Sequence, residues 1–147
     1  MSRYHQKPVH FTFGNHDDYL NTHNVIQRSH NNYQRIGNVG VYTISVYNDF
    51  WDASLNITRL DEAMSFLETI DNNKDEHVII TVHNPIYSPN RNMVLPELTR
   101  RLEDFLDQHQ NNNIRCVLSG HTHRFSAYKR KDVLFLISPS SGGLLLK

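Results

Sequence analysis

Two short apolar runs rich in β-branched residues place the strongest constraint on the fold of this chain. They are HVIITV at residues 77–82 and IRCVL at residues 114–118, and such runs are typical of strands buried on both faces of a sheet. The segment between them carries apolar residues at helical spacing from about Leu95 to the polar tract at 108–113. A strand, a helix and a second strand in this order predict a layered α/β domain.

Other segments extend the pattern toward the amino terminus. Residues 8–13 (PVHFTF) predict a strand that ends abruptly at Gly14. Residues 33–46 contain two β-type runs with Gly37 and Asn38 between them, which predicts a hairpin.

A first helix is expected to start at Thr58, which has the side chain of an N-cap and acidic residues in the following turn, and to run to about Asp71. Residues 125–129 and 133–137 predict a closing pair of strands. The expected order is three strands, a helix, a strand, a helix and three strands. We expect one domain over residues 1–147, with mixed sheet flanked by helices.

Composition excludes several classes of protein. The 147 residues hold 15 Lys and Arg against 15 Asp and Glu, so the chain has no basic field that would indicate a nucleic-acid partner. The sequence has no apolar run long enough to span a membrane. Cys116 is the single cysteine, so no internal disulfide is possible. We therefore expect a soluble, cytoplasmic chain, and the sequence leaves its oligomeric state open.

Three polar motifs each follow the carboxyl end of a predicted strand. They are GNHD at residues 14–17, HNP at 83–85 and GHTH at 120–123. In layered α/β folds, the carboxyl ends of strands meet at the edge of the sheet where ligands bind. These residues, far apart in the sequence, are therefore expected to meet in space.

The histidines of the last two motifs have two interpretations. His121 and His123, separated by one residue in a turn opened by Gly120, could aim both imidazoles at a metal ion such as Zn, Fe or Mn. Alone, such a pair is more often two solvated surface histidines. His83, fixed by Pro85 at a strand end, is by itself more often a hydrogen-bonded residue than a ligand.

The GNHD motif is the most informative of the three. Asn15 offers a neutral oxygen ligand, and His16 has a carboxylate neighbour in Asp17 that could set its tautomer and raise its basicity. That arrangement suits a general acid near neutral pH. Alone, Asn-His-Asp is more often an ordinary turn.

Together, GNHD, H-x-P and GHTH in this order resemble the calcineurin-like metallophosphoesterase superfamily over roughly residues 8–141. The resemblance implies a sandwich of two mixed sheets flanked by helices and a site with two divalent metal ions, Mn, Fe, Zn or Mg. It implies Asn15, His83 and His121 as ligands of one ion and His123 as a ligand of the other. It also implies that His16, oriented by Asp17, binds phosphate and protonates the leaving oxygen.

Two motifs of that family are not found. Its Asp-x-His and Gly-Asp motifs would precede GNHD, whereas this sequence has no Gly-Asp dipeptide and has Asp-x-His only at 75–77 and 107–109, where we interpret it as chance. We therefore expect a fragment of a longer enzyme or a truncated member, with a partial domain. We expect the remaining ligands to bind one ion, weakly, because stable sites usually have three or four protein ligands.

The leading functional hypothesis is a metal-dependent phosphoesterase that needs the missing amino-terminal half for activity. The alternatives are a catalytically inactive domain that keeps a partial metal site and acts as a binding or regulatory module, and a remnant without function. The substrate is expected to be a phosphate ester, and the sequence does not indicate its class. The three motifs most resemble those of enzymes that hydrolyse small phosphodiesters. The basic cluster at 129–131 is expected to be a solvated turn.

Overall fold

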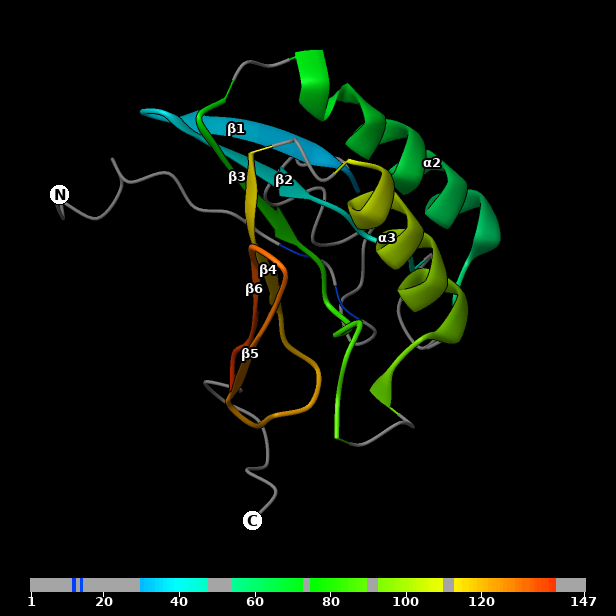
Figure 1. Cartoon of the computed structure of the whole chain (residues 1–147). Coiled ribbons are helices and arrows are strands. Elements are labelled where there is room, and N and C mark those ends of the chain that lie inside the picture. Colours follow the sequence, from blue (N-terminus) through cyan, green and yellow to red (C-terminus); the bar gives the residue numbers. More distant parts are fainter. Residues whose placement is uncertain are drawn as a thin grey trace, which may run out of the picture.

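The computed structural model of the chain describes residues 12, 14, 30–47, 54–72, 75–89, 93–109 and 113–139. In these ranges the chain forms one six-stranded sheet with two α-helices on one of its faces, as Figure 1 shows. The elements are β1 (Asn32–Ile36), β2 (Val39–Thr43), α2 (Ile57–Leu67), the 3-10 helix η2 (Glu68–Asn72), β3 (His77–Thr81), α3 (Pro96–Gln108), β4 (Ile114–Ser119), β5 (Ser126–Arg130) and β6 (Val133–Ile137).

The strand order is β1-β2-β3-β4-β6-β5. The four central strands β2, β3, β4 and β6 are parallel, and β1 and β5 pair antiparallel at the two edges. The crossovers β2–α2–β3 and β3–α3–β4 step the same way across the sheet, and crossovers of one hand place both helices on the same face. The expected α/β class with a mixed sheet flanked by helices is confirmed.

Parallel strands give the sheet two chemically distinct ends. We call the end where the parallel strands stop the carboxyl rim (residues 44–47, 82–84 and 119–123). We call the end where they start the amino rim (residues 75–77, 107–109 and 130–133). The three motifs GNHD, HNP and GHTH were all expected at the carboxyl rim.

Both predicted hairpins are present. β1 and β2 turn through Gly37, whose φ of 62° lies in the left-handed region that glycine adopts without a steric penalty. β5 and β6 turn through Lys131, with φ 52°. The predicted strand at 8–13 lies outside the described residues except for Thr12, whose hydroxyl donates to Thr81 Oγ1 at 3.0 Å.

The first helix starts at a different residue from the one expected. Asn56, not Thr58, is the N-cap: its backbone is extended, and its Oδ1 accepts a hydrogen bond from the Arg59 N–H at 2.9 Å. Thr58 already has helical backbone, so its side chain cannot serve the first turn, and that turn contains no acidic residue. The α-helix also ends earlier, at Leu67, and continues as η2 to Asn72.

α3 begins at Pro96. Proline has no backbone N–H, and none is needed here because an N–H in the first turn of a helix has no carbonyl partner.

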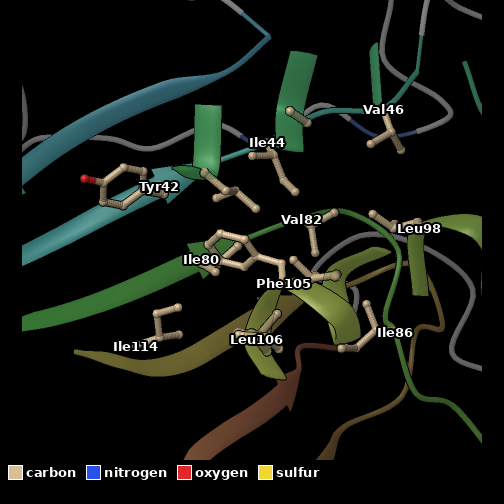
Figure 2. Close-up of a cluster of buried hydrophobic side chains, with 14 of the residues drawn as sticks. Tyr42, Ile44, Val46, Ile80, Val82, Ile86, Leu98, Phe105, Leu106 and Ile114 are labelled. Atoms are coloured by element: carbon tan, nitrogen blue, oxygen red, sulfur yellow. The ribbon is translucent and has the colours of Figure 1, made fainter. Parts of the chain in front are cut away.

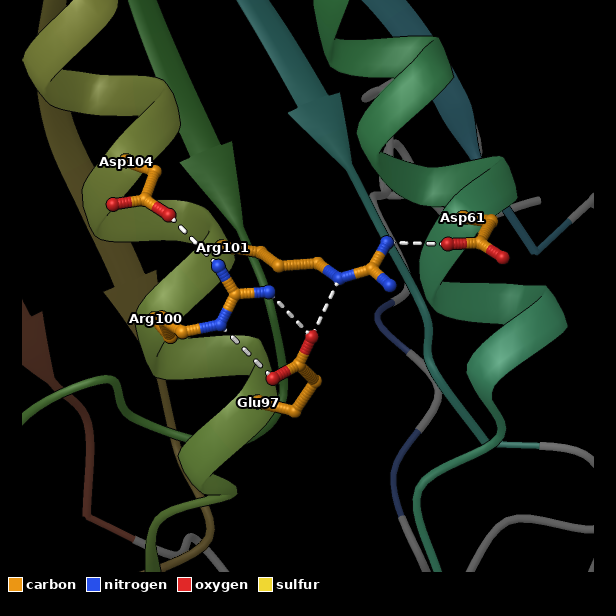
Figure 3. Close-up of polar contacts among 5 residues, drawn as sticks. All are labelled: Asp61, Glu97, Arg100, Arg101 and Asp104. Carbon is orange, nitrogen blue, oxygen red and sulfur yellow. Dashed lines mark hydrogen bonds and ion pairs between the residues drawn. The ribbon is translucent and has the colours of Figure 1, made fainter.

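Charged residues link the two helices, as Figure 3 shows. Arg100 and Arg101 both donate to Glu97, and Arg101 also binds Asp61 on α2. These hydrogen bonds hold the pKa of Glu97 at about 2. The pairs are exposed, so they orient the helices more than they stabilise them.

The core lies between the helices and the sheet (Figure 2). Tyr42, Ile80, Val117 and Phe135 occupy paired positions on neighbouring strands and point to the helix face. Leu98 and Leu102 of α3 are fully buried against them, and the predicted stripe of α3 is buried throughout. Each such side chain contributes roughly 1.5–3 kcal/mol by leaving water.

The other face of the sheet is apolar as well. Val41, Ile79, Cys116 and Leu134 form one paired row across it, and they are less completely buried than the row facing the helices. The described residues contain a single sheet, so the second sheet implied by the family resemblance is not among them. Neither helix in the described ranges has the length and apolar character that crossing a membrane requires.

Candidate functional site

His83 is the first side chain beyond the buried end of β3. Val82, which precedes it, is 1% exposed and donates its N–H to Leu118 O, so the chain is still bound to β4 there. The His83 carbonyl then accepts from the Gly120 N–H at 2.9 Å. The backbones of the HNP and GHTH motifs are thus tied together directly at the carboxyl rim.

The GHTH loop takes its sharp bend at the histidines themselves. His121 has φ 67° and His123 has φ 55°, whereas Gly120 is not in the left-handed region. The left-handed residues of this turn are therefore the two histidines and not the glycine that opens it. Left-handed backbone costs a non-glycine residue of order 1 kcal/mol or more, and such strain gathers at functional sites.

The bend brings two imidazoles together. His83 Nε2 lies 3.0 Å from His121 Nδ1, and the two rings meet at 73° with centroids 4.9 Å apart. Two unprotonated ring nitrogens would repel one another at this distance, so the pair needs either one proton or one cation between its lone pairs.

Gly14 packs against the same histidine. A Cβ built on Gly14 would lie 2.5 Å from both Cε1 and Nδ1 of His83, so only glycine fits beside this ring. The contact brings the start of the GNHD motif to the carboxyl rim. Asn15, His16 and Asp17 themselves lie outside the described residues.

Two residues at this rim were missed by the sequence reasoning. Tyr47, just beyond β2, places its ring edge-on to His83 at 6.0 Å, and its hydroxyl donates to Asn84 Oδ1. Burial raises the pKa of Tyr47 to about 12, so the phenol keeps its proton for that bond. Asn84 is 2% exposed and donates from Nδ2 to Met93 O at 3.3 Å. Two features of the sequence could have indicated these residues. Tyr47 follows the end of a predicted strand, and Asn84 is the middle residue of the HNP motif.

The two Asp-x-His triplets lie at the amino rim and take part in structural contacts. Asp75 accepts from the Tyr33 hydroxyl at both carboxylate oxygens, 3.0 Å each, and pairs with Arg35. Asp107 binds Arg130 and Lys131, so the basic cluster at 129–131 is more than the solvated turn that was expected. Both triplets are at the opposite end of the sheet from His83 and His121.

The described nitrogen donors are compatible with a divalent metal ion. With metal–nitrogen distances of about 2.0–2.1 Å, two nitrogens 3.0 Å apart subtend roughly 95° at the ion, which suits adjacent ligands. Within the ranges that the structure describes, no group of three or more His, Cys, Asp and Glu side chains is close enough to hold a metal ion.

Comparison with known proteins decides the family. The model of the calcineurin-like phosphoesterases matches residues 1–125 of the chain. The chain belongs to the calcineurin-like phosphoesterase family. No curated protein matches the chain.

A solved structure supports the family's fold for this chain. The chain is similar to GAP50, described as the anchor in the inner membrane complex of Plasmodium, with a TM-score of 0.52 and 14% sequence identity. The match covers 75% of this calcineurin-like phosphoesterase chain and 36% of GAP50, so the chain spans about a third of that protein's length. At this identity the likeness concerns the fold alone.

Proposed function

We propose that the chain carries part of the active site of a metal-dependent phosphoesterase, which hydrolyses a phosphodiester or phosphomonoester. The observation that carries this proposal is the 3.0 Å approach of His83 Nε2 to His121 Nδ1 at the carboxyl rim, within a chain of the calcineurin-like family. Imidazole nitrogens suit Zn and Fe, and oxygen ligands added to the same site would also admit Mn or Mg.

The proposed ligand set follows the three motifs. Asn15, His83 and His121 would hold one divalent ion, and His123 would contribute to a second. When bound, the ions neutralise charge on the phosphate oxygens and lower the pKa of a water molecule. His16, with Asp17 setting its tautomer, would donate a proton to the leaving oxygen.

Several described residues would keep this arrangement fixed. Gly14 leaves room for the His83 ring that a Cβ would occupy, and the His83 carbonyl accepts from the Gly120 N–H. Asn84, the residue that follows His83, is held by the Tyr47 hydroxyl, which donates to its Oδ1, and by its own bond to Met93 O. Ligands held by packing and by outer hydrogen bonds bind metal more tightly than mobile ones, typically by a factor of about 10–100.

Metal titration tests the ligand assignment without requiring turnover. We expect the 147-residue chain to bind Mn²⁺ measurably by isothermal titration calorimetry, and His121→Ala to weaken that binding by a factor of about 100 or more. His77→Ala is the matched control, because His77 is an exposed histidine at the amino rim. Equal effects of the two substitutions would contradict the assignment.

Turnover is a separate question. We expect little or no hydrolysis of an aryl phosphodiester by the 147-residue chain with Mn²⁺, because its sequence contains no Gly-Asp dipeptide and so lacks that family motif. Robust hydrolysis that is abolished by His121→Ala would show that the residues present are sufficient. Tight metal binding without hydrolysis, even in a version extended by the family's first two motifs, would favour the binding or regulatory module instead.

A further inference from the structure

A cavity of about 290 Å³ adjoins the histidine loop. One wall comes from the segment after the HNP motif, with Ser88, Pro89 and Met93, and the other from the chain that leaves the GHTH motif. Thr122 lines the cavity and lies between His121 and His123. The cavity is therefore next to the proposed metal ligands His121 and His123 in the sequence.

Phe125 gives this cavity its chemical character. Its side chain is 69% exposed, the highest value among the large apolar residues that the structure describes as exposed. A single exposed aromatic residue needs no explanation, but this one lines a concave site together with Pro89 and Met93. A flat aromatic face, a proline ring and a thioether suit the faces of a planar ring.

Polar groups at the same cavity suit the edges of such a ring. Ser88 and Ser126 bring hydroxyls, which both donate and accept hydrogen bonds, and Arg124 brings a guanidinium. The volume is near the lower end of the roughly 300–1,000 Å³ typical of small-molecule sites. That size fits one ring system and is too small for a folded macromolecular partner.

The cavity wall and the metal-site loop share one anchor. Asn84 donates to the carbonyl of Met93, which lines the cavity, and Asn84 is also the neighbour of His83. The cavity wall at Met93 is consequently tied to the segment that carries His83.

We propose that this cavity binds the alcohol part of the phosphoester substrate, and that this part is a planar aromatic group stacked on Phe125. The inference rests on the proposed phosphoesterase function and adds the class of substrate. Hydrolysis would then release an aryl alcohol or a nucleoside from the cavity, with the phosphate on the side of His83 and His121.

Ring probes without phosphate test the cavity independently of metal. Phenol and adenosine would each be titrated into the 147-residue chain and followed by the chemical shifts of the probe and of the Met93 methyl group. We expect saturable binding of at least one probe, weakened about tenfold by Phe125→Ala and retained in Phe125→Tyr. Tighter adenosine binding would identify a nucleoside, and tighter phenol binding an aryl alcohol.

Ile57→Ala is the matched control, because Ile57 is also an exposed large apolar residue, at 50%, but lies at the start of α2. Phe125 is exposed, so its replacement should leave the fold intact. The cavity proposal is overturned if neither probe binds, or if Phe125→Ala and Ile57→Ala have the same effect.

A phosphate series separates this proposal from the proposed function. With Mn²⁺ present, phenyl phosphate should bind about tenfold more tightly than methyl phosphate, and Phe125→Ala should remove the difference while leaving inorganic phosphate unchanged. Ring binding without any Mn²⁺-dependent phosphate binding would contradict the phosphoesterase function and the substrate role, and leave only a ring site. Phosphate binding without ring preference would contradict the cavity proposal alone.

Discussion

The two rims of the sheet use polar side chains in opposite ways. At the amino rim, acidic and basic groups are joined to one another: Asp75 with Tyr33 and Arg35, and Asp107 with Arg130 and Lys131. At the carboxyl rim, two imidazole nitrogens face each other at 3.0 Å on backbone that includes left-handed residues. Each rim also adjoins a cavity of similar size, about 270 Å³ and 290 Å³.

The difference shows why motif position matters more than motif composition. Asp-x-His is a metal-binding motif of the calcineurin-like phosphoesterase family. Here both copies make structural contacts, because one lies where β3 begins and the other where α3 ends. His83 and His121 have the same side chain as the histidines of these triplets, but they are candidate metal ligands because they lie where the parallel strands end. A substitution at one rim should therefore affect stability, and a substitution at the other should affect metal binding.

The largest expected effect is at the amino rim. Asp75→Ala removes a carboxylate that is 0% exposed and leaves the Tyr33 hydroxyl without its acceptor, so we expect a loss of about 2–3 kcal/mol in the free energy of unfolding. Urea unfolding measures it. Asp132→Ala, at an 89% exposed carboxylate, should change stability little. If Asp75→Ala lowered the Mn²⁺ affinity as much as His121→Ala does, the contrast between the rims would be wrong.

The two glycines at the carboxyl rim give the next effect. Gly14→Ala would force a Cβ to within 2.5 Å of the His83 ring, so the ring must move and Mn²⁺ affinity should fall about tenfold. Gly120→Ala meets nothing nearer than His83 O at 4.0 Å and should be tolerated. Calorimetric titration of both variants tests the prediction, and a larger loss in Gly120→Ala would refute it.

Strain at the histidine loop should be measurable as well. At φ 67°, glycine fits position 121 better than alanine does, so His121→Gly should be more stable than His121→Ala by about 1 kcal/mol. At Arg124, which is not left-handed, the order should reverse because glycine adds flexibility to the unfolded chain. Thermal unfolding of the four variants measures both differences, and the same order at both positions would argue against strain.

The smallest expected effect concerns acid. The folded pKa of Glu97 is about 2, below the ordinary value of 4.5, because Arg100 and Arg101 donate to its carboxylate. Its contribution to stability is therefore present above pH 4.5 and is lost as the pH falls through about 2. Glu97→Gln should lose less stability over this window, and added salt should shrink the difference because the pairs are exposed. An unchanged acid profile would show that these pairs are already screened.

Much of the fold followed from periodicity. The strands at 77–81 and 114–119, the stripe of α3 and both hairpins were predictable because apolar spacing and turn residues are local signals. The cap of α2 was not, because Asn56 and Thr58 are both good capping residues and only the backbone angles distinguish them.

For the site, the positions of the predicted strand ends indicated that His83 and His121 would lie close together. They did not indicate the geometry of the pair. Nothing local in the sequence shows that His121 rather than Gly120 takes the left-handed bend, or that Tyr47 reaches Asn84. Both depend on contacts between segments far apart in the chain. The roles of Asn15, His16 and Asp17 stay predictions, since these residues lie outside the described ranges.

The buried amide of Asn84 has a directional consequence. Its oxygen accepts from Tyr47 while its nitrogen donates to Met93 O, so turning the amide over would set oxygen against oxygen at Met93. A carboxylate of the same shape could satisfy Tyr47 only, and a leucine neither. The side chain at position 84 therefore links three segments, those of Tyr47, His83 and Met93, through hydrogen bonds of fixed direction. We expect these segments to unfold locally together, so that their backbone amides exchange with solvent as one cooperative unit.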